Sequence, residues 1–443
     1  MPFAGNSKMS TGDLPSCLCK RGSKCHKFSP PNIGTGILQD KSVEALWNVD
    51  SLVRRYIEGN PHRTFVMRLL MKPTVVVGKN SLVKALLTEK NDCMYNMLKD
   101  FFLGLFGNGI IFAEHDVAAE YKRLLLPLFS AEAFKNHEGM LDETIDFMFE
   151  RRLGDGKMEM YEEFKRLSLA YNLRMFLDID ERRTPELFER ISALTTTHWH
   201  GIISVPLNVK MPLIMSSGYR RAAEAKESLL QIIEEKMARA DVEFINQLSE
   251  SGMDRELVKN HILLFMCALV PKASASVLTN LLECSHLWYD RHVSDDGDID
   301  DAALETLLLE VVRLWPPFVG GLKAVTREIE LGDFHVPKGY CVFYTSSMAH
   351  RDPEVFPKAE EFLPERWATF NKDDRDKLYA FGAGLHSCVG EKLIWKYFMH
   401  VARRFTKEYT WDAEQFAGRE KKMKYVPISR PVDQEPVAIS PRT

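Results

Sequence analysis

Hydrophobic positions near the N-terminus follow the spacing of strands and short helices. Residues 74–77, Thr-Val-Val-Val before Gly78, form a β-branched run typical of a strand that ends at a glycine. Residues 81–88 then predict a helix for which Ser81 would serve as the N-terminal cap. We therefore expect a small sheet with helices packed on it over about residues 42–113.

The centre of the chain has a different pattern. From Val117 to about Glu283, apolar residues recur three or four positions apart, most regularly in residues 219–240 and 242–248, which predicts a large helical region. Alternation returns in residues 329–336, where it predicts a β-hairpin. The sequence thus predicts a mainly α protein with minor β sheets. Because no Pro/Gly/Ser-rich linker divides it, we expect one large domain over residues 32–443.

Composition and charge narrow the classes of function. A net charge of -4 and a pI near 6.4 provide no basic face for phosphate groups, so nucleic acid is excluded as an expected partner. The longest apolar stretches, around residues 262–270 and 101–113, fall short of the roughly 20 residues that cross a bilayer. We therefore expect no transmembrane anchor.

The first 31 residues differ from the rest of the chain. They carry five basic residues (Lys8, Lys20, Arg21, Lys24 and Lys27) against one acid, Asp13, which predicts a disordered or targeting tail. The spacing of Cys17, Cys19, Cys25 and His26 matches no standard zinc pattern. Because the eight cysteines form no regular framework, a reducing compartment is favoured. We expect a protein that is cytoplasmic or peripheral to a membrane, with organelle targeting by the tail as an alternative.

The strongest chemical feature is a cysteine at the entry to a helix. Residues 381–390, Phe-Gly-Ala-Gly-Leu-His-Ser-Cys-Val-Gly, precede an amphipathic helix at residues 391–404. Cys388 therefore lies near a helix N-terminus, whose unpaired N–H groups and positive dipole end favour a thiolate over a thiol. Glycines at 382, 384 and 390 remove side chains around it.

This segment resembles the cytochrome P-450 superfamily, whose signature F-x-x-G-x-(R/H)-x-C-x-G is matched at every fixed position. The resemblance implies a cytochrome P-450 fold with heme b between a long central helix and the cysteine loop, and Cys388 as the axial thiolate and metal ligand. It implies that Phe381, Gly384, His386 and Gly390 also bind the heme, the glycines by letting the backbone lie against the macrocycle. The resemblance is strong over about residues 305–411 and weaker back to about residue 117.

A second part of the resemblance is structural. Glu310 and Arg313 have the i, i+3 spacing that places both on one helical face, and Arg366 follows in the segment Pro-Glu-Arg-Trp. In the resembled family such residues form a buried ion network that fixes the segment leading to the cysteine. Buried charges persist only when they are mutually paired, so we expect Glu310, Arg313 and Arg366 to contact one another.

Heme propionates need cationic partners, and the resemblance offers three. His386 occupies the first position, Lys323 the second, and Lys122 the third, where the family more often has arginine. Lysine provides a point charge rather than a planar fork, so clamping of a propionate by Lys122 remains open beside an ordinary solvated lysine.

The chain departs from the family in the central helix. Residues 261–278, HILLFMCALVPKASASVL, contain no Asp, Glu, Thr or Gly, although the family has an acid and a threonine there for water and proton delivery. Depending on the register, Pro271 or Lys272 replaces the threonine, and Ser274 and Ser276 are the nearby hydroxyls. A proline inside a helix frees a carbonyl one turn back, which predicts a bent helix.

Three interpretations of this departure remain open. The preferred hypothesis is a heme-thiolate oxidoreductase that rearranges or cleaves a fatty acid hydroperoxide without an external electron donor, like an epoxyalcohol synthase, an allene oxide synthase or a hydroperoxide lyase. The alternative is an NAD(P)H- and reductase-dependent monooxygenase of a lipid, terpenoid or steroid, with a redox partner protein and with Ser274 as a catalytic residue in place of the threonine. A non-catalytic heme sensor or carrier is a further alternative.

The substrate expected from either enzymatic interpretation is a hydrophobic small molecule. An apolar segment would fall in the region that often roofs the heme pocket, although a plain core role is equally compatible with its composition. Its members are Phe101, Phe102, Leu105, Phe106, Ile110, Ile111 and Phe112.

Overall fold

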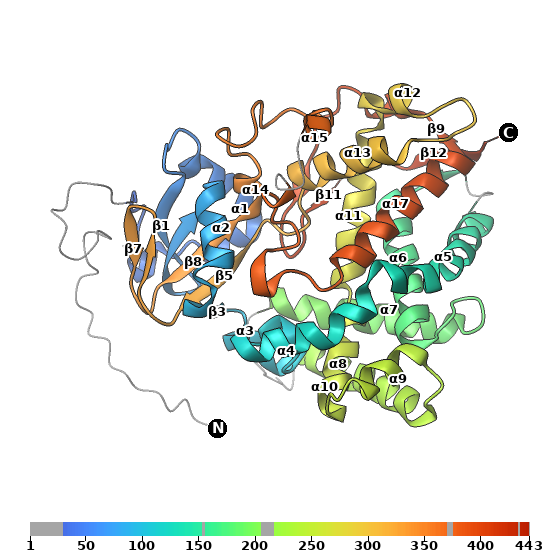
Figure 1. Cartoon of the computed structure of the whole chain (residues 1–443), viewed down its shortest axis with the longest axis horizontal. Helices are drawn as coiled ribbons and strands as arrows, with labels where there is room; N and C mark the ends of the chain where they lie inside the picture. The colour runs from blue at the N-terminus through green and yellow to red at the C-terminus, as the bar shows by residue number, and fades with distance from the viewer. Residues whose placement is uncertain (1–29, 153–155, 205–216, 370–374, 433–434, 443) are drawn as a thin grey trace.

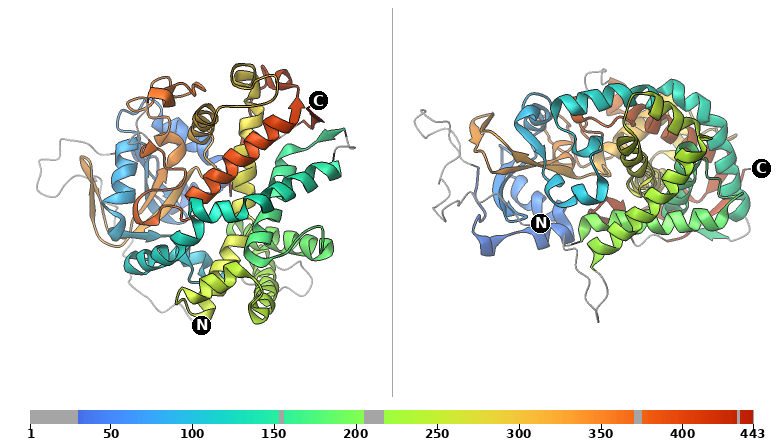
Figure 2. Two further views of the ribbon diagram at one scale, coloured as in Figure 1. Left: turned by 45° about the vertical axis from the view of Figure 1, so that its right-hand side comes forward. Right: turned by 90° about the horizontal axis from the view of Figure 1, so that it is seen from below.

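The computed structural model describes residues 30–152, 156–204, 217–369, 375–432 and 435–442. Most of them are helical, with minor sheets, as the sequence predicts, and the largest sheet lies at one side of the molecule (Figures 1 and 2). The predicted tail, with Cys17, Cys19 and Cys25, lies outside the described residues except for its last two positions. The assignment of one heme domain to residues 32–443 stays a prediction.

The helices fall into two regions of the molecule. Those near the sheets are α1 (Ser42–Ile57), α2 (Asn80–Thr88), α3 (Lys99–Phe106) and α14 (Ser346–Ala349). The helical lobe, on the right in Figure 1, contains α4 (His115–Leu125), α5 (Ala131–Arg152), α6 (Met160–Leu177), α7 (Pro185–His200), α8 (Gly218–Arg239), α9 (Glu243–Glu250), α10 (Arg255–Met266), α11 (Leu269–Glu283), α12 (Tyr289–His292), α13 (Asp301–Leu314) and α17 (Glu391–Glu408). The short helix α15 (Arg366–Thr369) packs against α13.

Five strands of the described chain form the main sheet, in the order β1-β2-β8-β5-β3. Strand β2 pairs antiparallel with β1 and parallel with β8, and β5 pairs antiparallel with β8 and β3. The strands are β1 (Thr64–Leu69), β2 (Lys72–Val77), β3 (Met94–Asn96), β5 (Gly320–Val325) and β8 (Cys341–Thr345). Smaller sheets contain β4 (Lys157–Met158), β12 (Val437–Pro441) and β9 (Tyr409–Trp411), then β10 (Met423–Lys424) with β11 (Arg430–Pro431), and the predicted hairpin β6 (Ile329–Leu331) with β7 (Phe334–Val336).

Alternation along β2 explains why helices cover both faces of the sheet. Val75 and Val77 belong to the same buried cluster as Leu86 of α2, whereas Val76 belongs to the cluster of Leu52 from α1. Successive side chains of a strand point to opposite faces, so one β-branched run supplies two cores. The predicted strand at residues 74–77 and the predicted helix after it are both confirmed.

The cap predicted for α2 is wrong. The helix begins at Asn80 rather than Ser81, Ser81 is exposed, and no side chain of the preceding residue caps the first turn. Instead the Asn80 backbone N–H donates to the Asp352 carboxylate over 2.8 Å, from a segment 272 residues away in sequence. A free N–H at a helix start needs an acceptor, and here tertiary structure provides it.

The predicted bend in the central helix is present. Helix α10 ends at Met266, Cys267 has an extended backbone (φ −65°, ψ 157°), and α11 starts at Leu269. Pro271 has no N–H with which to bond the Cys267 carbonyl, so the helical ladder opens one turn before it. Residues 255–283, through α10 and α11, form the stretch of the described chain that is long and apolar enough to cross a membrane, but 78% of its apolar 18-residue window is buried inside the protein. It is therefore a core segment here.

Candidate heme-binding site

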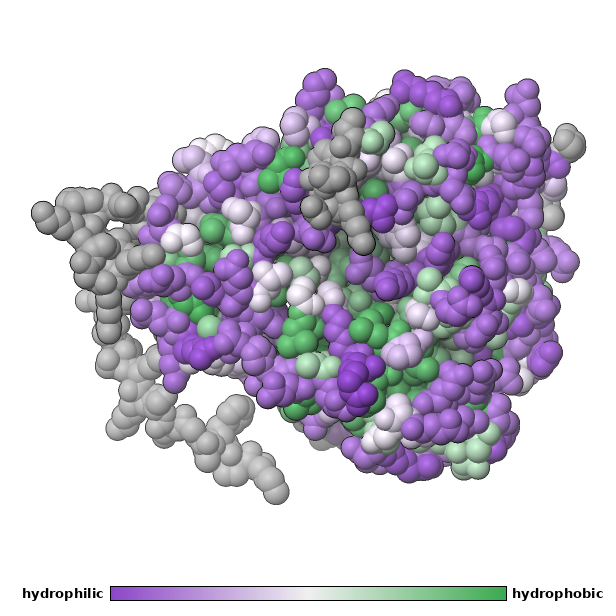
Figure 3. Space-filling model, viewed as in Figure 1, coloured by the Kyte–Doolittle hydropathy of each residue, from purple (hydrophilic) through white to green (hydrophobic). Residues whose placement is uncertain are grey.

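A cavity of about 430 Å³ lies where the sheet, α11 and the cysteine loop meet. Its wall includes Ser274 and Val277 of α11, Lys323 of β5, and the loop residues Phe381 and Cys388. The surface in Figure 3 is mostly hydrophilic, with apolar side chains gathered over the junction between the sheet and the helical lobe. The cavity thus combines an apolar wall with a few polar groups, which is the usual composition of a small-molecule site.

The cysteine loop holds its thiol at a helix start, as predicted. Gly390 precedes the first residue of α17, and the Cys388 backbone N–H donates to the Phe381 carbonyl over 2.8 Å. That bond closes the loop upon itself. Phe381 also lines the cavity and packs edge-on against Trp395 of α17, with ring centroids 6.3 Å apart.

The electrostatics of Cys388 differ from the simple helix-terminus prediction. Cys388 is exposed on the wall of an open cavity, but the protein atoms around its sulfur desolvate the thiol and raise the pKa of Cys388 to about 11. Hydrogen bonds from the backbone N–H groups of Gly390 and Glu391, and the charge of Lys122, act in the opposite direction. The helix N-terminus therefore favours the thiolate, as expected, without outweighing burial, and a positive partner for the sulfur is needed to complete its deprotonation.

The glycines of the cysteine loop have backbone conformations and close contacts that favour glycine. Gly382 and Gly384 have φ values of 71° and 64°, in the left-handed region where a glycine is favoured. A Cβ on Gly384 would lie 2.6 Å from the Leu87 carbonyl oxygen of α2. Gly384 is therefore required by its turn and by its close contact with α2, and its contact with the heme stays a prediction. A Cβ on Gly390 would lie 3.9 Å from the Cys388 sulfur.

Three basic side chains predicted from the sequence, Lys122, Lys323 and His386, gather near the cysteine loop. Lys323 and His386 line the cavity, and burial lowers the pKa of Lys323 to about 8 and that of His386 to about 4. Neighbouring Lys323, His115 and Lys122 lower the pKa of His386 further. Lys122 donates to the carbonyl oxygens of Gly384 and Leu385, over 3.1 and 3.3 Å, and to the Ser387 hydroxyl. Burial disfavours the charged forms of Lys323 and His386, and an anionic ligand group at this end of the cavity would favour their protonation.

The two serines of the central helix have different environments. Ser274 is buried and lines the cavity, whereas the Ser276 hydroxyl donates to the Ser429 carbonyl over 2.6 Å and thereby ties α11 to the segment before β11. Lys272, one of the residues at the threonine position, is directed elsewhere: its amine contacts His200 Nε2 of α7 at 2.9 Å. Of the candidate hydroxyls, Ser274 alone keeps a place in the cavity wall among the described residues.

The predicted roof is mostly core. Of the seven apolar residues between 101 and 112, only Ile111 lines the cavity. Phe102, Leu105, Phe106 and Phe112 are fully buried within the helical lobe's core cluster. Residues that the sequence did not single out form much of the wall instead; they are Trp199, Ile202, Leu269, Val270, Ala273, Pro317 and Phe318. Their spacing in α7 and α11 is ordinary helical periodicity, which cannot tell a cavity wall from a core.

The structure brings together Glu310, Arg313 and Arg366, the ion network predicted from the sequence. Arg313 donates from Nε and Nη2 to the two carboxylate oxygens of Glu310, over 2.9 and 2.8 Å, and both side chains are fully buried. Arg366 Nε donates to Glu310 over 3.1 Å. Trp367, which the sequence analysis did not include, donates its indole N–H to the same carboxylate over 2.9 Å. Every acceptor of Glu310 thus has a partner, as a buried charge requires.

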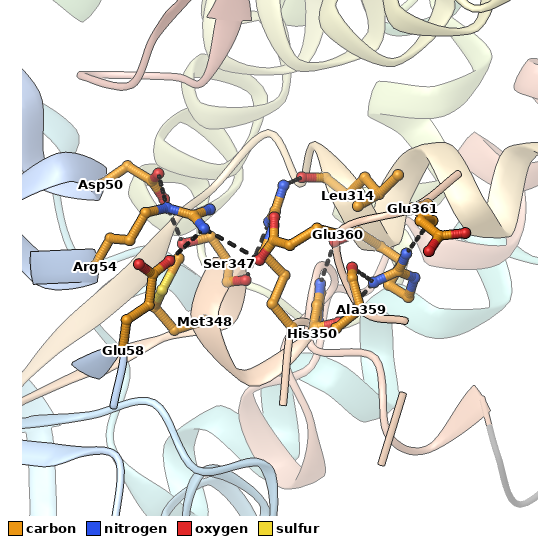
Figure 4. A network of polar contacts seen from close by, with 12 residues as sticks. Asp50, Arg54, Glu58, Leu314, Ser347, Met348, His350, Ala359, Glu360 and Glu361 are labelled. Carbon is orange, nitrogen blue, oxygen red and sulfur yellow. Dashed lines mark hydrogen bonds and ion pairs between the residues drawn. The ribbon is translucent and has the colours of Figure 1, made fainter. Parts of the chain in front are cut away.

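A second network, not predicted, continues from the first (Figure 4). Glu360 accepts from Arg54 of α1 and from Arg351, each over 3.1 Å, and Arg351 also donates to the Leu314 carbonyl at the end of α13. His350 connects the two networks, because its backbone carbonyl accepts from Arg313 over 2.9 Å. The sequence segment His-Arg-Asp-Pro-Glu-Val-Phe-Pro at residues 350–357 contains His350 and Arg351, but spacing alone did not indicate their partners.

Comparisons with known proteins agree with this geometry. The family model described as Cytochrome P-450 matches residues 302–409, which span α13, the ion network and the cysteine loop. Cytochrome P-450 26B1 of Danio rerio is 26% identical, over 77% of this chain and 72% of the relative. Beta-amyrin 28-monooxygenase of Barbarea vulgaris is 23% identical, over 89% of this chain and 87% of the relative. A solved structure described as retinoic acid bound cyanobacterial CYP120A1 superposes with a TM-score of 0.76 at 19% identity, covering 93% of this chain and 99% of that one.

The fold and the site thus define a heme-thiolate protein. The chain belongs to the cytochrome P-450 superfamily. It is an enzyme of that type, and its cofactor is heme b with an axial cysteine thiolate. The cavity fits such a group, because a thiol faces it from the loop and the buried amine of Lys323 has no hydrogen bond or ion pair recorded within the described residues.

Proposed function

We propose that this chain is a heme-thiolate monooxygenase of a hydrophobic small molecule, with Cys388 as the axial ligand and residues 32–443 as its heme domain. One observation carries the proposal: the Cys388 thiol and the buried Ser274 of α11 line the same apolar cavity. Heme bound through a thiolate supplies the oxidative chemistry. The chain's own residues bind, orient and protonate.

Each polar group of the cavity has a distinct task in this proposal. Lys323 and His386 receive the heme propionates, and Lys122 fixes the backbone of the cysteine loop through Gly384 and Leu385. Ser274 offers a hydroxyl in the cavity wall that would hold and donate a proton there. Trp199, Ile202 and Phe318 exclude water and select an apolar substrate.

The nature of the relatives favours this monooxygenase over the hydroperoxide hypothesis preferred from the sequence. One relative is named a monooxygenase of β-amyrin, and a structural neighbour is described with retinoic acid bound. Both of those molecules are hydrophobic and contain no peroxide bond. A monooxygenase also needs electrons, and the proposal therefore includes a redox partner protein that supplies them.

A second function rests on a different observation. The described residues that line the cavity include no Asp, Glu or Thr. Proton delivery therefore depends on Ser274 and water, and a substrate hydroperoxide would avoid that step because its O–O bond is already formed. Rearrangement or cleavage of a fatty acid hydroperoxide thus remains the second candidate.

One experiment separates the two functions. The purified chain is supplied with reductase, NADPH and isotopically labelled dioxygen, with β-amyrin or retinoic acid as substrate, and in parallel with linoleic acid hydroperoxide alone. We expect labelled oxygen in a product of the first reaction and a strong loss of product in Ser274→Ala. Consumption of the hydroperoxide without reductase, together with no labelled product, would replace the monooxygenase by the second candidate.

A further inference from the structure

A second cavity, of about 260 Å³, lies between the end of α11, the end of α13 and the segment 416–422. Helix α11 borders both cavities: Ser274 and Val277 face the heme cavity, whereas Thr279 and Glu283 face the second one. Among the described residues, the two walls have no member in common. We call the second cavity the α11 pocket; its wall includes Thr279, Glu283, Trp315, Phe362, Phe416 and Lys421. Its size suits a small ligand.

Thr279 brings a buried hydroxyl to this pocket. Its side chain is 1% exposed, and its Oγ1 has no hydrogen bond within the described chain. The other buried threonines of the described helices, Thr144, Thr195 and Thr406, each donate to a carbonyl three or four residues back. Such a bond is the usual way in which a threonine inside a helix satisfies its hydroxyl. Because an unpaired buried hydroxyl costs free energy, Thr279 favours a hydrogen-bonding molecule in the pocket.

Two further polar groups lie beside this hydroxyl. Glu283 follows Thr279 by four residues in α11, so both are on the same face of the helix. The Glu283 carboxylate lies 2.7 Å from the Lys421 amine, which itself lies 4.3 Å from the centroid of the Trp315 ring. All four residues line the pocket. The pocket therefore offers hydrogen-bond donors and an acceptor next to an aromatic ring.

Aromatic rings form the apolar part of the wall. Trp315, which follows the last residue of α13, stacks with Phe362, with ring centroids 6.2 Å apart and planes inclined by 23°. Phe416, at the end of the short helix η8 (Ala413–Phe416), also lines the pocket. Flat aromatic side chains give a ring-shaped ligand a large apolar contact area. The composition of the wall thus favours a ligand that contains a ring.

Ion pairs in the wall indicate the charge of the ligand. Glu283 is paired with Lys421, Glu435 lies 2.8 Å from Arg419, and Glu360 is paired with two arginines (Figure 4). A charged ligand would have to separate one of these pairs or bury its own charge beside them, and either change costs free energy. A neutral hydroxyl avoids that cost, because it can accept from Thr279 and donate to Glu283.

We propose that the α11 pocket binds an uncharged ring compound that carries a hydroxyl group, at a site distinct from the heme cavity. The ring lies against Trp315 and Phe416. Thr279 donates to the hydroxyl of the ligand, which donates in turn to Glu283. This inference does not depend on the proposed reaction, because no described wall residue belongs to both cavities.

Calorimetric titration of the heme-loaded protein with 2-naphthol tests the proposal. The heme iron is first ligated by 4-phenylimidazole, which occupies the heme cavity and leaves the α11 pocket accessible. We expect saturable binding of 2-naphthol under these conditions. Naphthalene lacks the hydroxyl, and 2-naphthoate carries a charge for which the wall has no free partner, so each should bind at least about tenfold more weakly.

Substitutions of Thr279 test the hydroxyl directly. Thr279→Val should weaken the binding of 2-naphthol at least about tenfold, whereas Thr279→Ser should bind like the wild type. Because the Thr279 hydroxyl has no partner within the described chain, Thr279→Val without ligand should have a thermal midpoint at least as high as that of the wild type. Thr195→Val is the matched control: its hydroxyl bonds the Ser192 carbonyl in α7, away from the pocket, so 2-naphthol binding should be unchanged.

Three results would overturn the proposal at the level of binding. They are no binding of 2-naphthol while 4-phenylimidazole is bound, equal affinity of the wild type and Thr279→Val, and tighter binding of 2-naphthoate than of 2-naphthol. A lower thermal midpoint of Thr279→Val without ligand would show that the hydroxyl already has a partner, which would remove the basis of the site.

Discussion

Arg313 donates two parallel hydrogen bonds, 2.9 and 2.8 Å long, to the carboxylate of Glu310, and both side chains are fully buried. The other N–H groups of Arg313 donate to the carbonyl oxygens of His350, Ala359 and Glu361, over 2.7 to 3.0 Å. The pair thus fixes helix α13 to the segment that leads to Arg366 and the cysteine loop. Removing Glu310 would leave the buried Arg313 without its carboxylate, and removing Arg313 would take from Glu310 its fully buried partner and leave it Arg366.

Glu310→Ala and Arg313→Ala should each destabilise the protein by about 3 to 5 kcal/mol, because a buried charge loses its partner. Thermal or urea unfolding of the heme-loaded protein measures this loss. Arg291→Ala is the matched control: Arg291 lies 3.9 Å from Glu365 in an exposed pair, and such a change should stay within about 0.5 kcal/mol. Soluble variants of Glu310 or Arg313 with unchanged stability would contradict a structural role for the network.

Cys388→Ser should abolish the red-shifted Soret band of the ferrous carbon monoxide complex, because that band requires a thiolate opposite the carbon monoxide. Cys93→Ser, at a partly exposed cysteine of η2 (Asn91–Cys93) away from the cavity wall, should keep it. A Cys388→Ser protein that retains the band would show that another residue holds the iron. Absorbance spectra of both variants, recorded with heme content, decide the matter.

Lys122→Ala should lower heme retention, since the amine both orders the loop carbonyls of Gly384 and Leu385 and adds positive charge beside Cys388. Lys122→Arg should largely restore it, because arginine keeps the charge and several donors. Arg123→Ala, one residue away and paired with Glu120 on the surface, provides the control and should behave like the wild type. Equal heme loss rates in all four proteins would remove Lys122 from the site.

Local patterns in the sequence predicted the elements whose cause is local. The β-branched run before Gly78 formed β2, the spacing of Glu310 and Arg313 placed them on one turn, and Pro271 opened the helix one turn before it. Each of these outcomes depends on chemistry within about five residues. The motif around Cys388 also predicted the cysteine loop, because the sequence matches the family signature at every fixed position.

Features set by distant segments could not be predicted in this way. The N–H at the start of α2 donates to Asp352, and Glu310 accepts a hydrogen bond from the indole of Trp367, which lies beyond α13. The cavity wall was missed for the same reason: Phe106 and Ile111 have the same apolar character in the sequence, yet one is core and the other faces the cavity. Only tertiary packing distinguishes them.

Acid should loosen the cysteine loop through His350. This buried imidazole accepts the Tyr379 backbone N–H at Nε2 over 2.7 Å, and its Nδ1 contacts the Arg313 carbonyl at 3.2 Å, so a second proton would have to displace the Tyr379 bond. Burial, with the charges of Arg313 and Arg351, lowers the pKa of His350 to about 3. The unfolded chain binds that proton near its ordinary pKa of about 6.5, so unfolding takes up a proton between the two values.

Stability should therefore be unaffected by this group above about pH 6.5 and should fall as the pH decreases toward 3. The Tyr379 carbonyl accepts a hydrogen bond from the Gly382 N–H at the start of the cysteine loop. Heme loss should therefore accompany the fall in stability. Thermal midpoints and heme retention of the wild type and of His350→Gln, measured from pH 7 to pH 5, test this. The variant starts less stable but should lose less on acidification, because glutamine takes up no proton. Parallel pH profiles for the two proteins would show that His350 does not carry the acid sensitivity.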